Sequence, residues 1–216
     1  MTLDKVAGRA RASGLDVFGA LHPDERDGLP AQVRTLVLLG PAEPGFWPRV
    51  TAEPEFSDGR PDALDRWSQR VSGGIASQFG AQAYFPFTGP PWRPFIDWAQ
   101  RSGRAWASEV GILVHDTAGL MVSYRGALGL PERLELPAPG ARPCDTCTGK
   151  PCLGACPVVA LTSQGYDIPA CKRYLSSAAG SDCLNSGCRV RRACPLSQAH
   201  GRHAEQSGYH MRHFAR

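Results

Sequence analysis

The chain has 216 residues, of which 42% are hydrophobic and 20% are charged, a balance typical of a folded protein rather than a disordered one. Its net charge of +4 is uneven, because residues 1–140 carry 14 basic and 16 acidic side chains and residues 141–216 carry 10 and 4. No apolar run approaches the roughly 20 residues of a membrane-spanning helix, and the N-terminus lacks the apolar core of a signal peptide, so we expect a cytoplasmic protein with no membrane partner.

Helix and strand patterns alternate through the first 136 residues, which predicts an α/β domain. A helix is expected from residue 3 until Gly14, followed by strands over 16–21 and 35–40. The second strand is a continuous apolar run, as is typical of a buried strand. Residues 41–61 are rich in Pro, Gly and Glu and predict a long loop.

The remainder of this domain is expected to add two helices and three strands. Apolar side chains at helical spacing predict a helix over 64–79 and a short one over 95–103, with a strand over 81–87 between them. Strands over 111–115 and 119–128 are expected to pair with each other as a hairpin.

A change of composition marks a boundary near residue 140. Three prolines within 137–143 exclude a helix or a central strand there and predict a linker. We therefore expect an α/β domain over 1–136, this linker, and a small domain with a basic tail over 144–216. The basic excess could attract nucleic acid, but no nucleic-acid-binding motif accompanies it, so a solvated arginine surface is the preferred interpretation.

The cysteines predict two [4Fe-4S] clusters. All eight lie in two groups that each end in a Cys-Pro step: Cys144-x2-Cys147-x4-Cys152-x3-Cys156-Pro157, and Cys171 followed by Cys183-x4-Cys188-x5-Cys194-Pro195. Bacterial ferredoxins use the run C-x2-C-x2-C-x3-C-P, and the last cysteine of each run binds the other cluster. That crossing assigns one cluster to Cys144, Cys147, Cys152 and Cys194, and the second to Cys156, Cys171, Cys183 and Cys188.

Three other uses of the thiols compete with this prediction. Two tetrahedral zinc sites need the same number of thiolates, although a Cys-Pro step has no mechanical role in a zinc ribbon. A single cluster with spare thiols is the second alternative. Four disulfides are the third, and they would need an oxidising compartment. Iron–sulfur clusters transfer single electrons. If the cysteines bind two clusters, we therefore expect an electron donor protein as a partner.

At the cysteine groups and in the stretch before them, the chain resembles epoxyqueuosine reductase and, more distantly, reductive dehalogenases. Cys171-Lys-Arg-Tyr-Leu175 is similar to the family's cysteine-x-x-Tyr-Leu segment, and Tyr84-Phe-Pro-Phe-Thr-Gly-Pro90 follows the order of its active-site loop. The N-terminal half also resembles the cobalamin-processing protein CblC, over residues 36–41 and 110–126.

This resemblance implies a nitroreductase-like α+β domain that binds cobalamin, joined to a ferredoxin-like domain with two clusters that reduce the cobalt. The corrinoid contacts that it implies are Phe87, Thr88, Gly89, Pro90, Arg93, Arg104, Trp106 and Ser108. The implied function is reductive cobalamin processing or trafficking. If the chain is an enzyme, the resemblance implies a cobalamin-dependent or cobalamin-processing oxidoreductase. The alternatives are a ferredoxin whose N-terminal domain only docks partners, reduction of the epoxyqueuosine kind, and a zinc-stabilised binding protein.

Two departures separate the chain from epoxyqueuosine reductases. Phe87 stands where that family has a catalytic aspartate, and a phenyl ring cannot donate a proton. No helical-repeat tail of the kind that helps the family hold tRNA follows Cys194. We therefore carry over the scaffold and not the queuosine reaction.

The histidines are interpreted as structural. His115, beside Asp116, is expected to be a hydrogen-bonded turn residue rather than a lower cobalt ligand. The C-terminal histidines have metal-like spacing but no third ligand, and are expected in a frayed terminus: His200, His203, His210 and His213.

Overall fold

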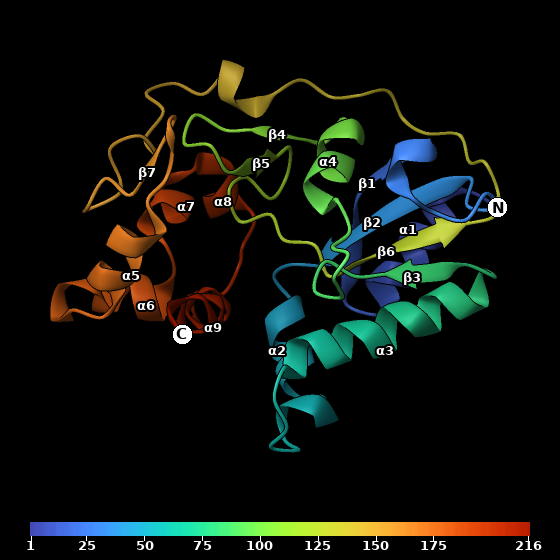
Figure 1. Cartoon of the computed structure of the whole chain (residues 1–216), viewed down its shortest axis with the longest axis horizontal. Coiled ribbons are helices and arrows are strands. Elements are labelled where there is room, and N and C mark those ends of the chain that lie inside the picture. The colour runs from blue at the N-terminus through green and yellow to red at the C-terminus, as the bar shows by residue number, and fades with distance from the viewer. The chain divides into compact units, whose positions relative to one another are not determined.

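The computed structural model describes all 216 residues, which divide into two compact units (Figure 1). Unit 1 comprises Met1–Arg104 and Ser123–Gly140, and unit 2 comprises Ala105–Val122 and Ala141–Arg216. The break after residue 140 falls within the expected linker. The expected domain 1–136 is wrong in one respect, because residues 105–122 belong to the unit that holds the cysteines.

Unit 1 is a mixed α/β unit around one antiparallel sheet. Its strands are β1 (Leu15–Leu21), β2 (Thr35–Pro41), β3 (Gln82–Tyr84) and β6 (Gly126–Leu130), and its helices are α1 (Leu3–Ala12), α2 (Phe46–Thr51), α3 (Ala63–Gln78) and α4 (Phe95–Arg101). The strand order is β1-β2-β6-β3. Figure 1 shows α3 and α4 on opposite sides of this sheet.

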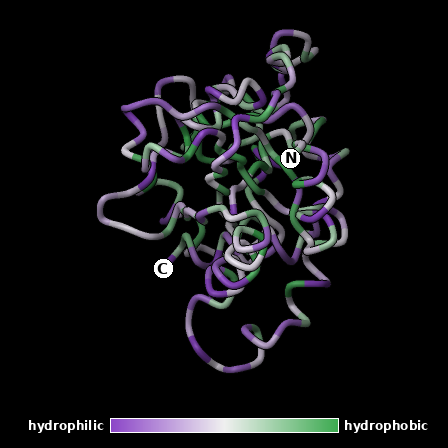
Figure 2. Tube along the Cα trace, turned by 90° about the vertical axis from the view of Figure 1, so that its right-hand side faces the viewer, coloured by the Kyte–Doolittle hydropathy of each residue, from purple (hydrophilic) through white to green (hydrophobic).

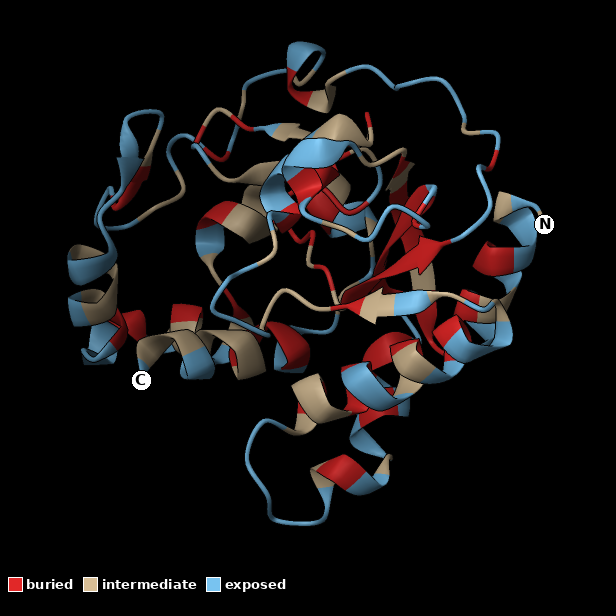
Figure 3. Ribbon diagram, turned by 45° about the vertical axis from the view of Figure 1, so that its right-hand side comes forward, coloured by how far each residue is buried: buried red, intermediate tan, exposed pale blue.

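The two central strands are buried along their whole length, as Figure 3 shows. An antiparallel strand with one solvated face would alternate apolar and polar residues. The continuous apolar run of β2 therefore reflects a sheet that is covered on both faces. The prediction of a buried strand from that run is confirmed, as is α1, which buries Val6, Ala7 and Ala10.

The long loop expected over 41–61 is wrong, because the segment contains α2 and a short 3-10 helix over Pro54–Phe56. Three apolar side chains of α2 are buried and anchor it. The Phe46 ring packs edge-on against Trp67 at 5.4 Å, and Trp47 packs edge-on against Phe56 at 5.7 Å. The Pro and Gly content concealed this aromatic contact pattern.

The expected hairpin over 111–128 is also wrong. Only its turn forms, with His115 and Gly119 exchanging two backbone hydrogen bonds of 3.0 Å. The first strand, β5 (Leu113–His115), pairs with β4 (Ala105–Ala107) in unit 2. The second becomes β6, which lies between β2 and β3 in the sheet of unit 1. The strand expected over 81–87 ends early, at Tyr84.

Unit 2 combines short helices with two small antiparallel sheets. The sheets are β4-β5 and β7-β8, with β7 at Leu161–Thr162 and β8 at Gly165–Tyr166. The helices are α5 (Ile168–Leu175), α6 (Ser181–Ser186), α7 (Arg189–Ala193), α8 (Pro195–Ala199) and α9 (Ala204–Ala215). The C-terminus is not frayed as expected, because α9 packs closely on α6, where Gly208 lies against the backbone of Asn185.

In Figure 2 the hydrophobic stretches lie mainly inside the trace, whereas the projecting loops are largely hydrophilic. None of the helices combines the length and hydrophobicity that crossing a bilayer requires. The expectation of a mixed α/β fold is thus confirmed at this coarse level, with small antiparallel sheets.

Candidate metal centres

Unit 2 brings the eight cysteines together in two cavities of four. The first cavity is lined by Cys144, Cys147, Cys152 and Cys194, and the second by Cys156, Cys171, Cys183 and Cys188. Each cavity therefore collects the four cysteines that were expected to act together. In both groups, three cysteines come from one part of the chain and the fourth from the other.

The first cavity is formed mainly by the loop that follows the linker. Cys144 lies in a 3-10 turn over Pro143–Asp145, and its carbonyl accepts a backbone hydrogen bond from Cys147. Cys144 and Cys152 are buried, whereas Cys147 is partly exposed. The cavity has a volume of about 380 Å³ and is also lined by Ser108, on the segment between β4 and β5.

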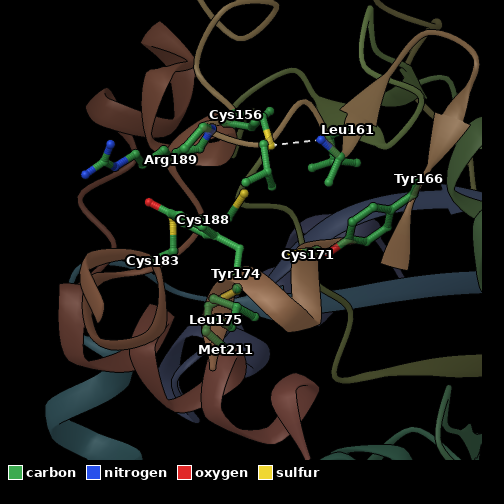
Figure 4. Close-up of a pocket in the computed structure, with 14 residues that line it drawn as sticks. Cys156, Leu161, Tyr166, Cys171, Tyr174, Leu175, Cys183, Cys188, Arg189 and Met211 are labelled. Atoms are coloured by element: carbon green, nitrogen blue, oxygen red, sulfur yellow. Dashed lines mark hydrogen bonds between the residues drawn. The ribbon is translucent and has the colours of Figure 1, made fainter. Parts of the chain in front are cut away.

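The second cavity is formed mainly by helices (Figure 4). Cys171 lies on α5, Cys183 on α6, and Cys188 immediately before α7. Cys156 reaches the same cavity from the loop of the first group. Figure 4 shows these four cysteines around the cavity, with Tyr166 on one side and Arg189 on the other.

Helix α7 explains how the two groups cross. Cys188 precedes its first residue and Cys194 follows its last, so one short helix separates a cysteine of the second cavity from a cysteine of the first. A five-residue helix is about 7.5 Å long. Pro195 then begins α8 directly after Cys194, where its missing N–H costs no intrahelical hydrogen bond. The Cys-Pro step thus ends one helix and starts the next.

The space between the cavities is filled by an apolar core. Val190, on α7, is fully buried, and it packs in one hydrophobic cluster with Leu161 and Leu120. Cys144 and Cys152 belong to that cluster, and six further side chains with partial burial pack against it, among them Cys156, Cys188 and Cys194. A shared core of this kind fixes both cavities relative to each other.

Three close contacts surround the sulfur atoms. The backbone N–H of Ala160 donates to Cys156 Sγ at 3.1 Å, shown in Figure 4, and the Tyr166 hydroxyl donates to Cys171 Sγ at 3.2 Å. A Cβ atom on Gly119 would lie 3.0 Å from Cys194 Sγ. Gly119 also has a φ of 55°, so both its conformation and its surroundings favour glycine.

Burial raises the pKa of four of the thiols: Cys144, Cys152, Cys171 and Cys183. Neighbouring cysteines raise these pKa values further, because each additional thiolate repels the others. Both effects favour the neutral thiols, and holding all four as thiolates would need a bound cation to offset their charge.

Positive side chains flank both cavities. Arg191, on α7 between Cys188 and Cys194, donates a hydrogen bond to the carbonyl of Leu120, and burial lowers the pKa of its guanidinium. Leu120 lines the first cavity, whereas the charge of Arg191 also acts on Cys188 in the second. Arg191 is thus a partly buried cation between the two groups of cysteines.

Glu109 attaches the segment between β4 and β5 to the loop of the first cavity. Its carboxylate accepts from Lys150 Nζ at 2.9 Å and from Arg142 at 3.1 Å. The hydrogen bond from Lys150 and the charge of both cations lower the pKa of Glu109. These contacts give a physical reason why residues 105–122 belong to unit 2.

No group of three or more His, Cys, Asp or Glu side chains is arranged to hold a metal ion. All eight cysteines are free thiols.

The residues expected to contact a corrinoid do not meet in one unit. Phe87, Thr88, Gly89, Pro90, Arg93 and Arg104 belong to unit 1, whereas Trp106 and Ser108 belong to unit 2. Ser108 lines the first cysteine cavity, and Trp106 packs against the core beside it. Trp106 and Ser108 thus belong to the unit that holds the cysteines, and not to the N-terminal unit as expected.

Within unit 1, local contacts engage the remaining corrinoid candidates. Arg93 donates to the Gly28 carbonyl at 3.2 Å, and Arg104 donates to that of Val17 at 2.8 Å. Phe87 stacks on Phe85 with ring centroids 5.4 Å apart. Thr88 donates to the Phe85 carbonyl at 3.2 Å, and the Trp92 ring lies against Gly89, which precedes Pro90 in the chain. These side chains are thus held by contacts within unit 1.

His115 is a turn residue, as expected. Its side chain is buried, and Nδ1 accepts hydrogen bonds from the backbone N–H groups of Thr117 and Ala118 at 3.2 and 3.3 Å. Asp116 Oδ1 lies 3.1 Å from the same nitrogen.

Sequence reasoning missed Tyr166 and Glu109 near the sulfurs. It counted Arg191 among the positive side chains around the cysteines but did not identify its position between the two groups. The signal for Arg191 was available, since it lies three residues from both Cys188 and Cys194. Tyr166 and Glu109 gave no signal, because their contacts depend on how distant loops fold together.

Comparison of the chain with models of protein families, with curated proteins and with solved structures finds no match. The arrangement of the residues themselves therefore carries the functional argument.

Proposed function

We propose that unit 2 binds two [4Fe-4S] clusters and transfers single electrons, in the manner of a two-cluster ferredoxin. The observation that carries this proposal is the division of the eight cysteines into two cavities of four, with none left over. The spacing rule of bacterial ferredoxins predicts the same division, including the crossing of the last cysteine in each run.

The surroundings of the sulfurs support this donor set. Ligating sulfurs in iron–sulfur proteins accept hydrogen bonds that tune the reduction potential. Ala160 and Tyr166 would provide such hydrogen bonds to Cys156 and Cys171. Arg191 would offset part of the negative charge of the thiolates on both sides of α7.

The competing uses of the thiols have less support. Zinc would need the same eight thiolates, but a zinc ribbon gives no mechanical role to the Cys-Pro steps that end both groups. Disulfides would consume thiols that are all free and grouped in fours. A single cluster would leave the other four cysteines gathered in a cavity that binds nothing, although Tyr166 donates a hydrogen bond to one of the sulfurs of the second cavity.

We propose that unit 1 binds the group that accepts the electrons from the clusters. The alternative is that unit 1 only docks partner proteins. The family resemblance suggests a nitroreductase-like unit that binds cobalamin, in a cytoplasmic protein supplied by an electron donor. Cobalamin stays a prediction, which rests on the resemblance alone, and two of its eight expected contact residues, Trp106 and Ser108, belong to unit 2. The cluster proposal does not depend on it.

The experiment that tests the proposal is metal and sulfide analysis of the protein after anaerobic purification and reconstitution. We expect about eight irons and eight acid-labile sulfides per chain, four of each for every cluster. Stoichiometric zinc with little iron would contradict the proposal. Titration of the same preparation with hydroxocobalamin tests the corrinoid prediction separately, since binding would shift the cobalamin spectrum and raise the melting temperature.

A further inference from the structure

An exposed apolar patch lies beside the second cysteine cavity. It consists of Val158, Val159, Tyr166 and Ile168, of which Val159 is 68% exposed, Ile168 44%, and the other two 37% each. Val158 and Tyr166 also line the cavity itself. The patch and the cavity therefore share a wall, and a protein that covered the patch would lie next to the sulfurs.

Tyr166 connects this surface directly to a candidate ligand. Its hydroxyl lies 3.2 Å from Cys171 Sγ, and one face of its ring stacks on Phe214 with centroids 5.9 Å apart. The Lys172 ammonium lies 5.5 Å from the Phe214 ring. The partly exposed Tyr166 ring is thus joined to Cys171 Sγ by one hydrogen bond. On its other side Tyr166 contacts Phe214, which in turn contacts the Lys172 ammonium.

Basic side chains outnumber acidic ones in the stretch of the chain that carries the patch. Residues 141–216 hold 10 Lys and Arg against 4 Asp and Glu. Lys172 of α5 reaches the patch through its contact with Phe214, and its ammonium also donates to the carbonyl oxygen of Arg216 at 2.6 Å. The carboxylate of Asp167 is used as the N-cap of α5, and that of Asp182 is shared by Arg189 and Arg192 at 2.7 and 2.5 Å. The stretch of the chain that carries the patch therefore has a net charge of +6.

We propose that this patch is the docking surface of an acidic, low-potential electron-carrier protein that exchanges electrons with the second cluster. The inference rests on the proposed function of unit 2. An apolar centre with a charged border is the usual composition of a protein interface, and complementary charge speeds the encounter. One electron leaves the reduced carrier and enters the oxidised cluster, so the carrier is oxidised and the cluster reduced by one electron, with no bond made or broken.

The test measures how fast the reconstituted protein is reduced by a reduced plant-type ferredoxin, an acidic carrier with a potential near −400 mV. The rate constant should fall severalfold between about 50 and about 300 mM salt, because salt screens the attraction. Ile168→Asp places a negative charge at the patch, and we expect it to lower the rate constant at low salt by about tenfold.

The matched control is Ile96→Asp in unit 1, where the isoleucine is 65% exposed and also lies in the first turn of a helix. We expect this variant to change the rate constant by less than about twofold. Aspartate is favourable in the first turn of a helix, so both variants should fold. Lys172→Glu provides a second test of the patch should Ile168→Asp lose iron.

Equal rate constants for Ile168→Asp, Lys172→Glu and Ile96→Asp would overturn the docking proposal. So would a wild-type dimer that Ile168→Asp converts to a monomer, since the patch would then bind a second copy of the chain. Wild-type protein without iron and sulfide would instead contradict the proposed function, and the two failures are therefore distinguishable.

Discussion

Val159 adopts a backbone conformation that its side chain disfavours. Its φ is 52°, in the left-handed region, where a β-branched residue is a strong outlier. The turn that contains it lets the next residue, Ala160, direct its N–H to Cys156 Sγ. We infer that the chain accepts this strain because the hydrogen bond to sulfur requires the turn.

Val159→Asn should therefore stabilise the protein. A left-handed conformation costs an ordinary residue about 1–2 kcal/mol, and asparagine tolerates it far better. Val159 is 68% exposed, so the burial lost is about one third of the ~2 kcal/mol of a fully buried valine. The expected gain is about 0.5–1 kcal/mol, which corresponds to a rise in melting temperature of roughly 1–4 °C for a chain of this size.

The assay is anaerobic thermal unfolding of the reconstituted protein, followed by circular dichroism. Val158→Asn is the matched control, because Val158 has no left-handed φ and is 37% exposed. The control should leave the melting temperature unchanged or lower it. Equal decreases for the two variants would refute the strain argument.

Three further predictions concern single side chains. Tyr166→Phe removes a hydrogen bond to Cys171 worth about 1 kcal/mol, which is about 40 mV for a one-electron couple. Redox titration should therefore show the potential of one cluster lowered by about that amount. An unchanged potential would show that the hydrogen bond does not tune the cluster. Arg191→Gln should lower both potentials whereas Arg191→Lys should largely preserve them, and equal effects of the two variants would exclude a role for the charge. Burial raises the pKa of Asp27, but hydrogen bonds from Arg101, Trp98 and the backbone of Asp24 outweigh burial and lower the pKa overall. The ionised Asp27 therefore stabilises the fold above the unfolded-state pKa of about 3.9. This stabilisation is lost as the pH falls from there through the lower pKa of the folded state. Asp27→Asn should flatten the loss of stability in acid, measured by urea unfolding from pH 7 to pH 3; an unaltered pH profile would contradict this assignment.

The sequence predicted the elements whose signals are local. The apolar run of β2 and the helical spacing of α1 and α3 depend on neighbouring residues alone, and both the type and the position of these elements are confirmed. The grouping of the cysteines was also predictable, because two Cys-Pro steps mark where each run of ligands ends.

Long-range contacts explain the errors. A turn at His115–Gly119 forms as expected, but the strands on either side find better partners, and a local pattern cannot specify which distant strand wins. Helix α2 is held by Trp67, which lies in another element. Glu109 likewise gave no local signal for its ion pairs with Arg142 and Lys150.

The crossed assignment of the cysteines can be tested by two double variants. Cys144→Ser/Cys194→Ser alters two cysteines of the first cavity only, whereas Cys144→Ser/Cys156→Ser alters one cysteine in each. We predict that the first variant retains about four irons and the EPR signal of one reduced cluster, and that the second variant loses both clusters. The reverse result, with one intact cluster in Cys144→Ser/Cys156→Ser, would mean that each run of cysteines binds its own cluster, and would contradict the account.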